Sequence, residues 1–441
     1  MRINLTDNNV RPSSGEAFLR KDVSALFPIG DKTIAELCKE NENLLIFPFS
    51  IDKADDRIGE SSVISILNTD DPEKVTISTG NIMGFIGIGD LQVNIKSRFD
   101  QGRDNFLLHY MLQRVQSFNL FDLSHDNEYE DVFDFIMFMF PFFLKSALRQ
   151  GLYREYQNYK HNDANIKGPI DICRHIARNI PFIGNVAYST REYSQDNNLT
   201  ELIRHTIEFM KTKRYGQSVL NIDNETAQNV QTIVEHTPLY NKNDRRNIVN
   251  KNLRMKVHPY YTEYRPLQTL CLQILRMEEV KYGESDDEVC GILFDGAWLW
   301  EEYVNTILRD FNFTHPENKH YKGRIHLFED GGTRYPDFYK ENNCVLDAKY
   351  KRLGSYDKVS KVDREDIHQV IAYMKALNIP RGGFVVPLEE EQKKVPTSLL
   401  KNSTDTMSIY GIEICKEAKS YPEFCKRMKD LEKVFINSLQ L

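Results

Sequence analysis

The sequence predicts a mixed protein of the α+β and α/β classes with several domains. Three observations lead to this fold class: a length of 441 residues, alternating apolar residues near the N-terminus, and a C-terminal series of helix, strands, helix and strand. A chain of this length exceeds what one hydrophobic core usually serves. We therefore expect a β-rich N-terminal domain over residues 1–130, a mainly helical middle region over 131–269 and a compact α/β domain over 270–441.

The β-rich domain is expected from the segment LQVNIKSRF, which spans residues 91–99. Leu91, Val93 and Ile95 alternate with polar residues, as in a strand with one buried face. The preceding segment, GFIGIGD, indicates a second strand and a glycine-bearing turn. It does not complete the GxGxxG fingerprint because Gln92 holds the last position, and the chain has no Walker A sequence. We therefore expect this chain not to bind GTP itself.

Helical patterns prevail in the middle region, where polar segments such as QNYKHNDANIKGP and NIDNET interrupt them. The most apolar stretch of the chain, VFDFIMFMFPFFL over residues 132–144, begins this region and contains Asp134 and Pro141. It is shorter than the roughly 20 apolar residues that a membrane-spanning helix needs. We therefore expect a buried core helix and no association with a membrane.

The chain carries 57 Lys and Arg residues against 64 Asp and Glu, a formal net charge of −7. Proteins that hold DNA unaided usually have a basic excess, because neutralising phosphates supplies most non-specific affinity. An activity on DNA would therefore depend on a local basic patch or on a partner. Seven scattered cysteines without a CxxC pair disfavour a disulfide framework and a cysteine-bound metal cluster. The start has no apolar segment like that of a signal peptide, so we expect a cytoplasmic protein.

A candidate site lies in the segment YPDFYKENNCVLDAKYK, residues 335–351. The segments RIHLF, TRYPDFYK and CVLDAKYK predict a three-stranded meander joined by the turns EDGG and ENN. Because side chains alternate along a strand, Asp347 and Lys349 share one face. Hairpin geometry brings Asp337 from the neighbouring strand towards them.

Two carboxylates that converge in this way repel each other unless a cation lies between them or one stays protonated. Hard oxygen ligands suit Mg²⁺, which takes few protein carboxylates and keeps several waters. A lysine beside such a cation can orient the attacking water or stabilise charge on a phosphate. The alternative is a charged face in solvent, where the pair Asp347–Lys349 contributes at most about 1 kcal/mol.

Two predicted helices flank this segment. On GAWLWEEYVNTIL, residues 296–308, Glu301 lies at the edge of the apolar arc and can reach into a cleft. On REDIHQVIAYMKAL, residues 364–377, Gln369 and Tyr373 are four positions apart and lie together beside the apolar face. The ordered series of acid, Pro-Asp, Asp-x-Lys and Gln-x-x-x-Tyr is much rarer by chance than any of its parts.

This series resembles the PD-(D/E)xK nuclease superfamily, in the branch with a QxxxY element in the following helix. More narrowly, the chain resembles the McrC family, the nuclease subunits of McrBC-type restriction systems. The likeness covers about residues 81–387. Four stretches carry it: GFIGIGDLQVNIKSRF, GLYREYQNYKHNDANIKGPIDICRHI, YSQDNNLTELIRHTIEFM and YPDFYKENNCVLDAKYK.

The resemblance implies a restriction-endonuclease-like core in the C-terminal domain and a divalent cation, Mg²⁺ or Mn²⁺, as cofactor. It implies cation binding by Asp337, Asp347 and Glu301, assistance to the attacking water by Lys349, and an auxiliary pair, Gln369 and Tyr373. It also implies a McrB-like hexameric AAA+ GTPase as partner. The N-terminal region of this chain would dock on the partner, and the chain would stimulate the partner's GTP hydrolysis. The substrate implied is double-stranded foreign DNA, which in some systems is methylated.

A local excess of basic residues follows the site, with six bases between residues 349 and 364 against Asp357 and Asp363. The candidates for DNA binding are Lys351, Arg352, Lys358, Lys361 and Arg364. A solvated loop explains them equally well.

His258 and His315 each precede a proline and have no Ser or Cys elbow nearby, so we expect no role for them in nucleophilic catalysis. Two other functions stay open: a non-catalytic adaptor that activates the AAA+ motor, and a stand-alone repair nuclease of the RecB type.

Overall fold

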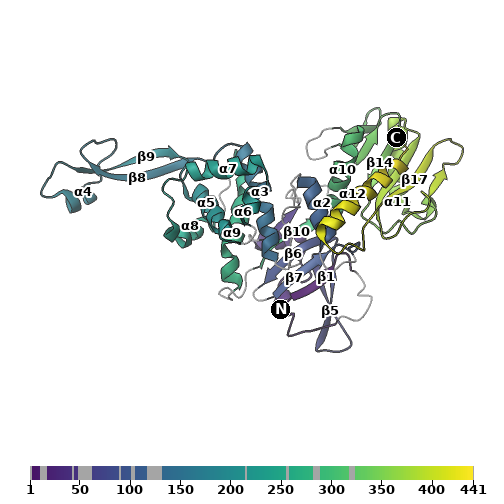
Figure 1. The fold of residues 1–441 in the computed structure, drawn as a ribbon, viewed down its shortest axis with the longest axis horizontal. Coiled ribbons are helices and arrows are strands. Elements are labelled where there is room, and N and C mark those ends of the chain that lie inside the picture. Colours follow the sequence, from purple (N-terminus) through teal and green to yellow (C-terminus); the bar gives the residue numbers. More distant parts are fainter. Residues whose placement is uncertain are drawn as a thin grey trace. The chain divides into compact units, whose positions relative to one another are not determined.

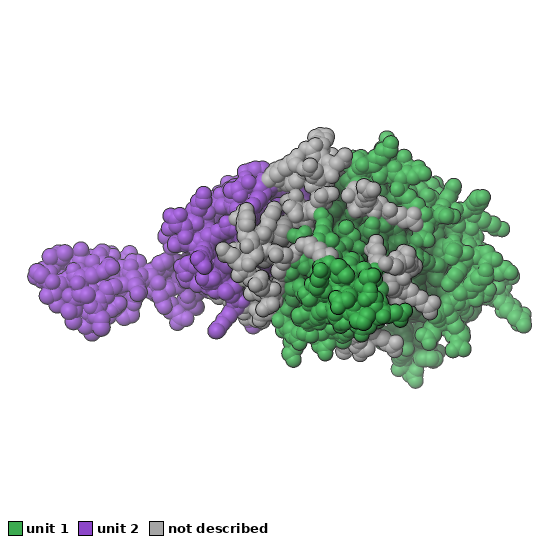
Figure 2. Space-filling view, turned by 90° about the horizontal axis from the view of Figure 1, so that it is seen from below, with its two compact units in different colours: residues 1–130, 285–441 green, residues 131–284 purple. Residues whose placement is uncertain are grey.

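The computed structural model describes residues 2–9, 17–41, 44–47, 62–88, 91–100, 105–116, 132–213, 216–254, 258–281, 289–316 and 323–440. The chain forms two compact units, coloured separately in Figure 2. Unit 1 combines residues 1–130 with residues 285–441, and unit 2 comprises residues 131–284. Unit 2 is therefore an insertion between the two halves of unit 1. This division differs from the three consecutive regions expected, because the C-terminal part of the chain completes the N-terminal sheet.

That N-terminal sheet has five strands in the order β1-β7-β6-β10-β3. Strand β10 pairs antiparallel with β6 and parallel with β3, although the whole of unit 2 separates it from both in sequence. Gly84 allows β6 and β10 to approach, since a Cβ at this position would lie 2.1 Å from the carbonyl oxygen of Ile292. The strands are β1 (Arg2–Thr6), β3 (Leu44–Phe47), β6 (Ile82–Ile88), β7 (Leu91–Lys96) and β10 (Val289–Asp295).

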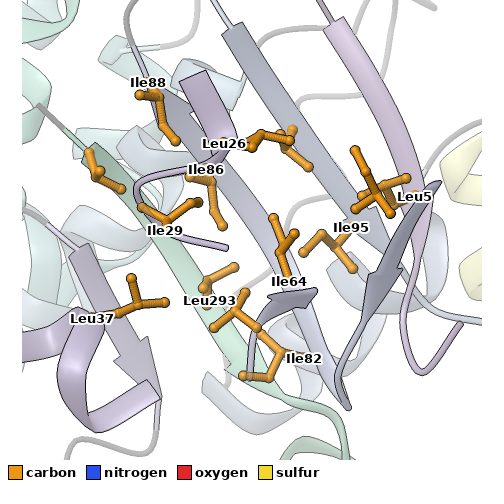
Figure 3. Close-up of a cluster of buried hydrophobic side chains, with 14 of the residues drawn as sticks. Leu5, Leu26, Ile29, Leu37, Ile64, Ile82, Ile86, Ile88, Ile95 and Leu293 are labelled. Carbon is orange, nitrogen blue, oxygen red and sulfur yellow. The ribbon is translucent and has the colours of Figure 1, made fainter. Parts of the chain in front are cut away.

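A smaller sheet in the order β2-β5-β4 and helix α1 (Ile34–Glu40) complete the N-terminal half. Its strands are β2 (Phe18–Leu19), β4 (Ile64–Asn68) and β5 (Lys74–Thr79). Helix α1 begins at a capping box in which Thr33 and Glu36 satisfy each other's backbone N–H groups. Aliphatic side chains from both sheets share one core, shown in Figure 3, to which Leu5, Ile64, Ile95 and Leu293 belong. The predicted strand at β7 is confirmed, with Leu91, Val93 and Ile95 buried.

The C-terminal half is built on a second five-stranded sheet in the order β13-β14-β15-β17-β16. The three central strands are parallel, and β13 and β16 are antiparallel edges. The strands are β13 (Phe338–Lys340), β14 (Cys344–Ala348), β15 (Arg381–Leu388), β16 (Thr397–Leu399) and β17 (Thr406–Glu413). Helices α10 (Gly296–Leu308) and α11 (Arg364–Leu377) both pack against β14, and α12 (Tyr421–Ser438) packs against β17. Helix α2 (Phe106–Gln116) packs against α10 and α12.

The expected three-stranded meander is wrong. Strands β11 (Ile325–Phe328) and β12 (Gly331–Arg334) form a separate two-stranded sheet, whereas β13 joins the large sheet. The chain leaves strand geometry at residues 335–337, where Pro336 has no N–H group to donate to a ladder. The segment TRYPDFYK therefore supplies two strands to two sheets rather than one continuous strand.

Unit 2 is a helical body from which a long hairpin projects (Figure 1). The predicted core helix is confirmed as α3 (Val132–Arg149), with Phe140, Phe143 and Leu144 buried. Helices α3 and α5 both pack on α9. The helices are α5 (Asn198–Lys211), α6 (Gly216–Leu220), α7 (Asn224–Glu235), α8 (Arg245–Asn252) and α9 (Tyr264–Lys281). Within the described residues, no helix has the length and apolar character needed to cross a bilayer.

The hairpin consists of β8 (Glu155–Asp163) and β9 (Val186–Ser194), with α4 (Ile172–Asn179) packed against β9. Part of the segment QNYKHNDANIKGP, expected as a polar break between helices, is therefore a strand. Alternate residues of β8 are half-buried and exposed, and Tyr156 lies 5.1 Å from Tyr193 across the pair, measured between ring centres. Cross-strand contacts of this kind stabilise a hairpin that has no apolar face of its own.

Candidate active site

Asp337 and Asp347 lie opposite each other at the end of the β13–β14 pair. Phe338 pairs with Leu346, and continuing that antiparallel register by one residue sets Asp337 against Asp347. The Asp337 side chain turns towards the partner strand, and its Oδ2 accepts a hydrogen bond of 2.7 Å from the backbone N–H of Ala348. Asp347 is buried, with 1% of its surface exposed. The structure thus brings together the two carboxyl groups that the sequence pattern singled out.

Lys349 is the nearest cation to this pair among the described residues. Its Nζ lies 2.9 Å from Asp347 Oδ2 and 3.4 Å from an oxygen of Asp366 on α11. The lysine backbone is held as well, because its N–H donates to the carbonyl oxygen of Val385 on β15 at 3.0 Å. The i and i+2 spacing therefore places the ammonium group beside the carboxylate, as the alternation of the strand predicts.

Helix α10 brings Glu301 to the same end of the sheet. The helix begins at Asp295, whose side chain accepts a hydrogen bond from the N–H of Trp298, and Trp300 donates its indole N–H to the carbonyl of Val385. Glu301 is half-buried at the edge of the buried face, as its sequence position predicts. Its charge acts on Asp337, whose pKa it helps to raise.

His315 belongs to this site, although its sequence context suggested a histidine without a role. Its Nδ1 lies 2.7 Å from the backbone carbonyl of Asp337, its ring stacks on Phe338 with 4.9 Å between centres, and its Nε2 lies 4.0 Å from Glu301 Oε1. Since a carbonyl only accepts, Nδ1 carries the proton and Nε2 faces Glu301. Nothing local in the sequence marks His315, because its partners come from two other segments of the chain, around Glu301 and Asp337.

Gln369 and Tyr373 form the pair expected on α11. The Gln369 amide donates to the Tyr373 hydroxyl at 2.9 Å, and that hydroxyl lies 3.5 Å from the carbonyl oxygen of Tyr335. Tyr373 is buried, and burial raises the pKa of its phenol. The pair therefore touches the backbone that leads into Asp337.

Burial and mutual repulsion make both aspartates hard to ionise. Burial first, then the charge of Glu301, raises the pKa of Asp337 to about 8. Burial first, then the charge of Asp337, raises the pKa of Asp347 to about 7, against the opposing effect of Lys349. The pKa of Lys349 is raised despite its burial, because Asp347 and the neighbouring acids favour its charged form. The site is therefore acidic, and both aspartates favour their protonated forms.

The donor set fits a hard divalent cation in part. Neither carboxylate oxygen of Asp347 has a hydrogen-bonding partner among the described residues, and the contact with Lys349 is an ion pair by distance. Two such carboxyl groups suit Mg²⁺, which binds few carboxylates and completes its shell with water. Within the described ranges, however, no group of three or more His, Cys, Asp and Glu side chains is arranged as a metal-binding cluster. Glu301 is thus near the aspartates without forming a closed ligand set with them.

Most of the basic side chains that are candidates for DNA binding form ion pairs with acidic side chains. Lys351 Nζ lies 2.6 Å from Asp366 Oδ2, Arg352 Nε 3.1 Å from Glu389, and Lys361 Nζ 2.5 Å from Asp357. The two remaining candidates, Lys358 and Arg364, are exposed and make no ion pair within the described part of the chain. Of the five candidates, Lys358 and Arg364 are therefore the ones whose side chains could contact a DNA phosphate without first leaving an acidic partner.

A buried ion pair joins the N-terminal sheet to the strand end that carries Lys349. Arg98 Nη1 lies 2.6 Å from Asp7 Oδ2 and 3.0 Å from Asn81 Oδ1, and its Nη2 donates to the carbonyl of Tyr350. The guanidinium also lies over the Tyr350 ring, 4.4 Å from its centre. Burial raises the pKa of Asp7 to about 6, against the effect of Arg98. Arg98 therefore ties the residue after Lys349 to strands from the start of the chain.

Comparison with known proteins places the chain in a family. The model of the McrBC 5-methylcytosine restriction system component family matches residues 77–387. The chain belongs to this family. The match includes Glu301, the two aspartates, Lys349 and both α11 residues, and it confirms the resemblance drawn from the sequence. No curated protein matches the chain.

Two solved structures to which the chain is similar come from Thermococcus gammatolerans. A chain from a half-complex of a tetradecameric assembly of Thermococcus gammatolerans McrB AAA+ hexamers with bound McrC aligns with a TM-score of 0.51 and 14% identity. The alignment covers 98% of this family member and 100% of that chain. A chain from the cryo-EM structure of the Thermococcus gammatolerans McrBC complex aligns over 70% of this chain and 87% of its own length, with a TM-score of 0.33 and 14% identity. The first of these likenesses shows a shared fold.

Proposed function

We propose that this chain is the nuclease subunit of a McrBC-type restriction complex, which cuts foreign double-stranded DNA with the help of Mg²⁺ or Mn²⁺. The observation that carries the proposal is the pair Asp337 and Asp347, in which Asp347 is buried, its Oδ1 has no hydrogen-bond partner among the described residues, and its Oδ2 lies beside the Lys349 ammonium. Parallel central strands with α10 and α11 packed on β14 support a PD-(D/E)xK core. Family membership supports the link to restriction.

Each residue of the site has its own role in the proposed cleavage reaction. Asp337 and Asp347 hold the cation, which when bound stabilises the negative charge that develops on the phosphodiester. Lys349 orients the attacking water and adds positive charge next to the scissile phosphate. Glu301 lies on the Asp337 side of the site, where His315 fixes the backbone of Asp337. Gln369 and Tyr373 support the chain segment that leads into Asp337.

We propose a hexameric McrB-like AAA+ GTPase as the partner, docked through the N-terminal region of this chain. Family membership and the fold shared with a chain of a McrB–McrC assembly support this choice. A partner that grips DNA also accounts for a net charge of −7 and for the engagement of three candidate DNA-binding bases by acids.

The test is cleavage of methylated and unmethylated plasmid by the purified complex with GTP and Mg²⁺. Wild-type complex should cut, and Asp347→Ala should abolish cleavage while GTP hydrolysis is still stimulated. Asp310→Ala, which removes an exposed acid of the same unit, is the matched control and should cut normally. Cleavage by Asp347→Ala at the wild-type rate would overturn the catalytic assignment.

A non-catalytic adaptor is the second candidate, favoured by the finding that the described residues contain no three-residue metal cluster. It predicts that the complex hydrolyses GTP when DNA is added but never nicks it, in Mg²⁺ or Mn²⁺. A stand-alone RecB-type repair nuclease is disfavoured by membership in a restriction-system family.

A further inference from the structure

Asp366 has a central place in the electrostatics of the proposed site, although no sequence pattern marked it. It lies in the first turn of α11 and is 9% exposed. One carboxylate oxygen, Oδ1, lies 3.4 Å from Lys349 Nζ, and the other, Oδ2, accepts a hydrogen bond of 2.6 Å from Lys351 Nζ. A single buried acid therefore contacts two lysines that come from the end of β14.

The ammonium group of Lys349 lies between two carboxylates with different tasks. Asp347, at 2.9 Å, is a proposed cation ligand, whereas Asp366 belongs to the neighbouring helix. A divalent cation bound by Asp347 repels the ammonium and competes for the same oxygens. Asp366 would then be the acceptor left for Lys349 among these contacts.

Lys351 fixes the orientation of Asp366 from outside. Its contact with Oδ2 leaves Oδ1 directed at Lys349, so the two lysines use different oxygens of one carboxylate. Helix α11 holds this carboxylate in place, since the helix begins with the Asp363 cap one turn away and packs against β14 and β15. The Asp366 carboxylate is thus preorganised before any cation or DNA binds.

We propose that Asp366 is a positioning residue that holds the Lys349 ammonium beside the cation site and keeps it from occupying that site. The inference rests on the proposed nuclease function and deepens it. Without Asp366, Lys349 has Asp347 alone as its close anionic partner among these contacts. It then competes with the cation and loses its fixed place near the phosphate.

The first test is cation binding without DNA, measured by calorimetry with Mn²⁺. Asp366→Asn should weaken Mn²⁺ binding by about tenfold, as removal of a supporting partner usually does. Glu365→Gln is the matched control, because it removes the same charge from the same turn of α11 at an exposed position. Equal Mn²⁺ affinity in Asp366→Asn and wild type would overturn the proposal, and so would an equal loss in Glu365→Gln.

The second test is steady-state DNA cleavage by the complete complex at saturating Mn²⁺. Asp366→Asn should lower kcat by about tenfold or more with KM for DNA nearly unchanged, and Asp366→Glu should restore part of the rate. Lys351→Gln should cause a smaller loss, because it leaves Oδ1 in contact with Lys349. A variant with a lower Tm but normal kcat would assign Asp366 a purely structural role and would contradict the proposal.

The two proposals fail in distinguishable ways. If wild-type complex never cuts DNA, the nuclease function fails and the positioning role fails with it. If wild type cuts, Asp347→Ala does not, and Asp366→Asn cuts at the wild-type rate, only the role of Asp366 is overturned.

Discussion

The carboxyl groups of Asp337 and Asp347 bind their protons far more tightly in the folded chain than in an unfolded one. Their pKa values rise from 3.8 to about 8 and about 7, first because the groups are buried and then because neighbouring acids repel their charge. Between about pH 4 and pH 8 the folded state thus holds more protons than the unfolded state. The free energy of unfolding falls as pH rises through this window.

Removing one of these charges should therefore stabilise the protein in alkaline solution. We expect Asp337→Asn to raise Tm at pH 8.5 in EDTA relative to wild type, with little difference at pH 5, where the wild-type carboxyl is already protonated. Thermal unfolding at the two pH values measures this. A variant that is less stable than wild type at pH 8.5 would show that the ionised aspartate is well accommodated without a cation.

Cation binding should show the matching pH dependence. A divalent ion bound by these carboxyl groups must displace their protons below pH 7 to 8, so apparent Mn²⁺ affinity should rise from pH 6 to pH 7 by up to about tenfold for each proton displaced. Calorimetry in buffers of different ionisation enthalpy should detect protons released on binding. Affinity that is independent of pH over this range would place the ion at other ligands.

The sequence was sufficient for part of this site. Asp337, Asp347 and Lys349 followed from strand alternation, and Glu301, Gln369 and Tyr373 from helical position, because these rules act within a few residues. His315 and Asp366 were missed for the opposite reason. The partner of His315 is a backbone carbonyl, and the importance of Asp366 comes from two lysines that follow β14 and lie about 15 residues before it in the sequence.

Among the elements, the connection through Arg98 links the N-terminal sheet to the end of β14. Asp7, Arg98 and Tyr350 come from three segments, and the guanidinium contacts both of the others. Buried charges of this kind are tolerated as long as each has its partner. The strand end that carries Lys349 therefore depends on residues from the start of the chain.

Breaking this connection should be costly. Arg98→Met leaves Asp7 buried without its cation, and we expect a loss of about 3–5 kcal/mol in the free energy of unfolding. The urea midpoint of unit 1 unfolding is the measurement, and Arg309→Met, at an exposed position, is the control. A loss below about 1 kcal/mol would mean that Asp7 folds in its protonated form at no cost.

Elements with strong local signals matched their predicted bounds, and elements that depend on remote partners did not. Helices α10 and α11 begin and end where the sequence indicated, and Asp295 and Asp363 cap their first turns. The β8–β9 hairpin was missed because its exposed and half-buried residues give no apolar face. The pairing of β10 with β6 could not be inferred from the sequence. Unit 2 lies between these two strands in the chain, and rules that act within a few residues cannot identify a pairing partner at that distance.

On the scale of the whole molecule, unit 2 interrupts unit 1 as a continuous segment with its own core. Buried residues from α3, α5 and α9 fill that core, among them Phe140, Leu144, Leu202, Ile207, Leu267 and Ile274. Such an insertion has the features of a domain that folds by itself.

We therefore expect residues 132–281, produced alone, to fold into a helical protein that unfolds cooperatively. Far-UV circular dichroism during heating is the measurement, with limited proteolysis as a second probe. A gradual loss of signal and rapid digestion of α5 would show that unit 2 needs unit 1 for its stability.

The pairing of β3 with β10 sets an order of events on the ribosome. Strand β3 emerges early, yet within the described residues its sheet neighbour is β10, which is translated only after all of unit 2. Until then β3 and one side of β6 lack that neighbour and present bare backbone edges to other nascent chains. Chains released before β10 is made should therefore aggregate, even though they contain a complete unit 2.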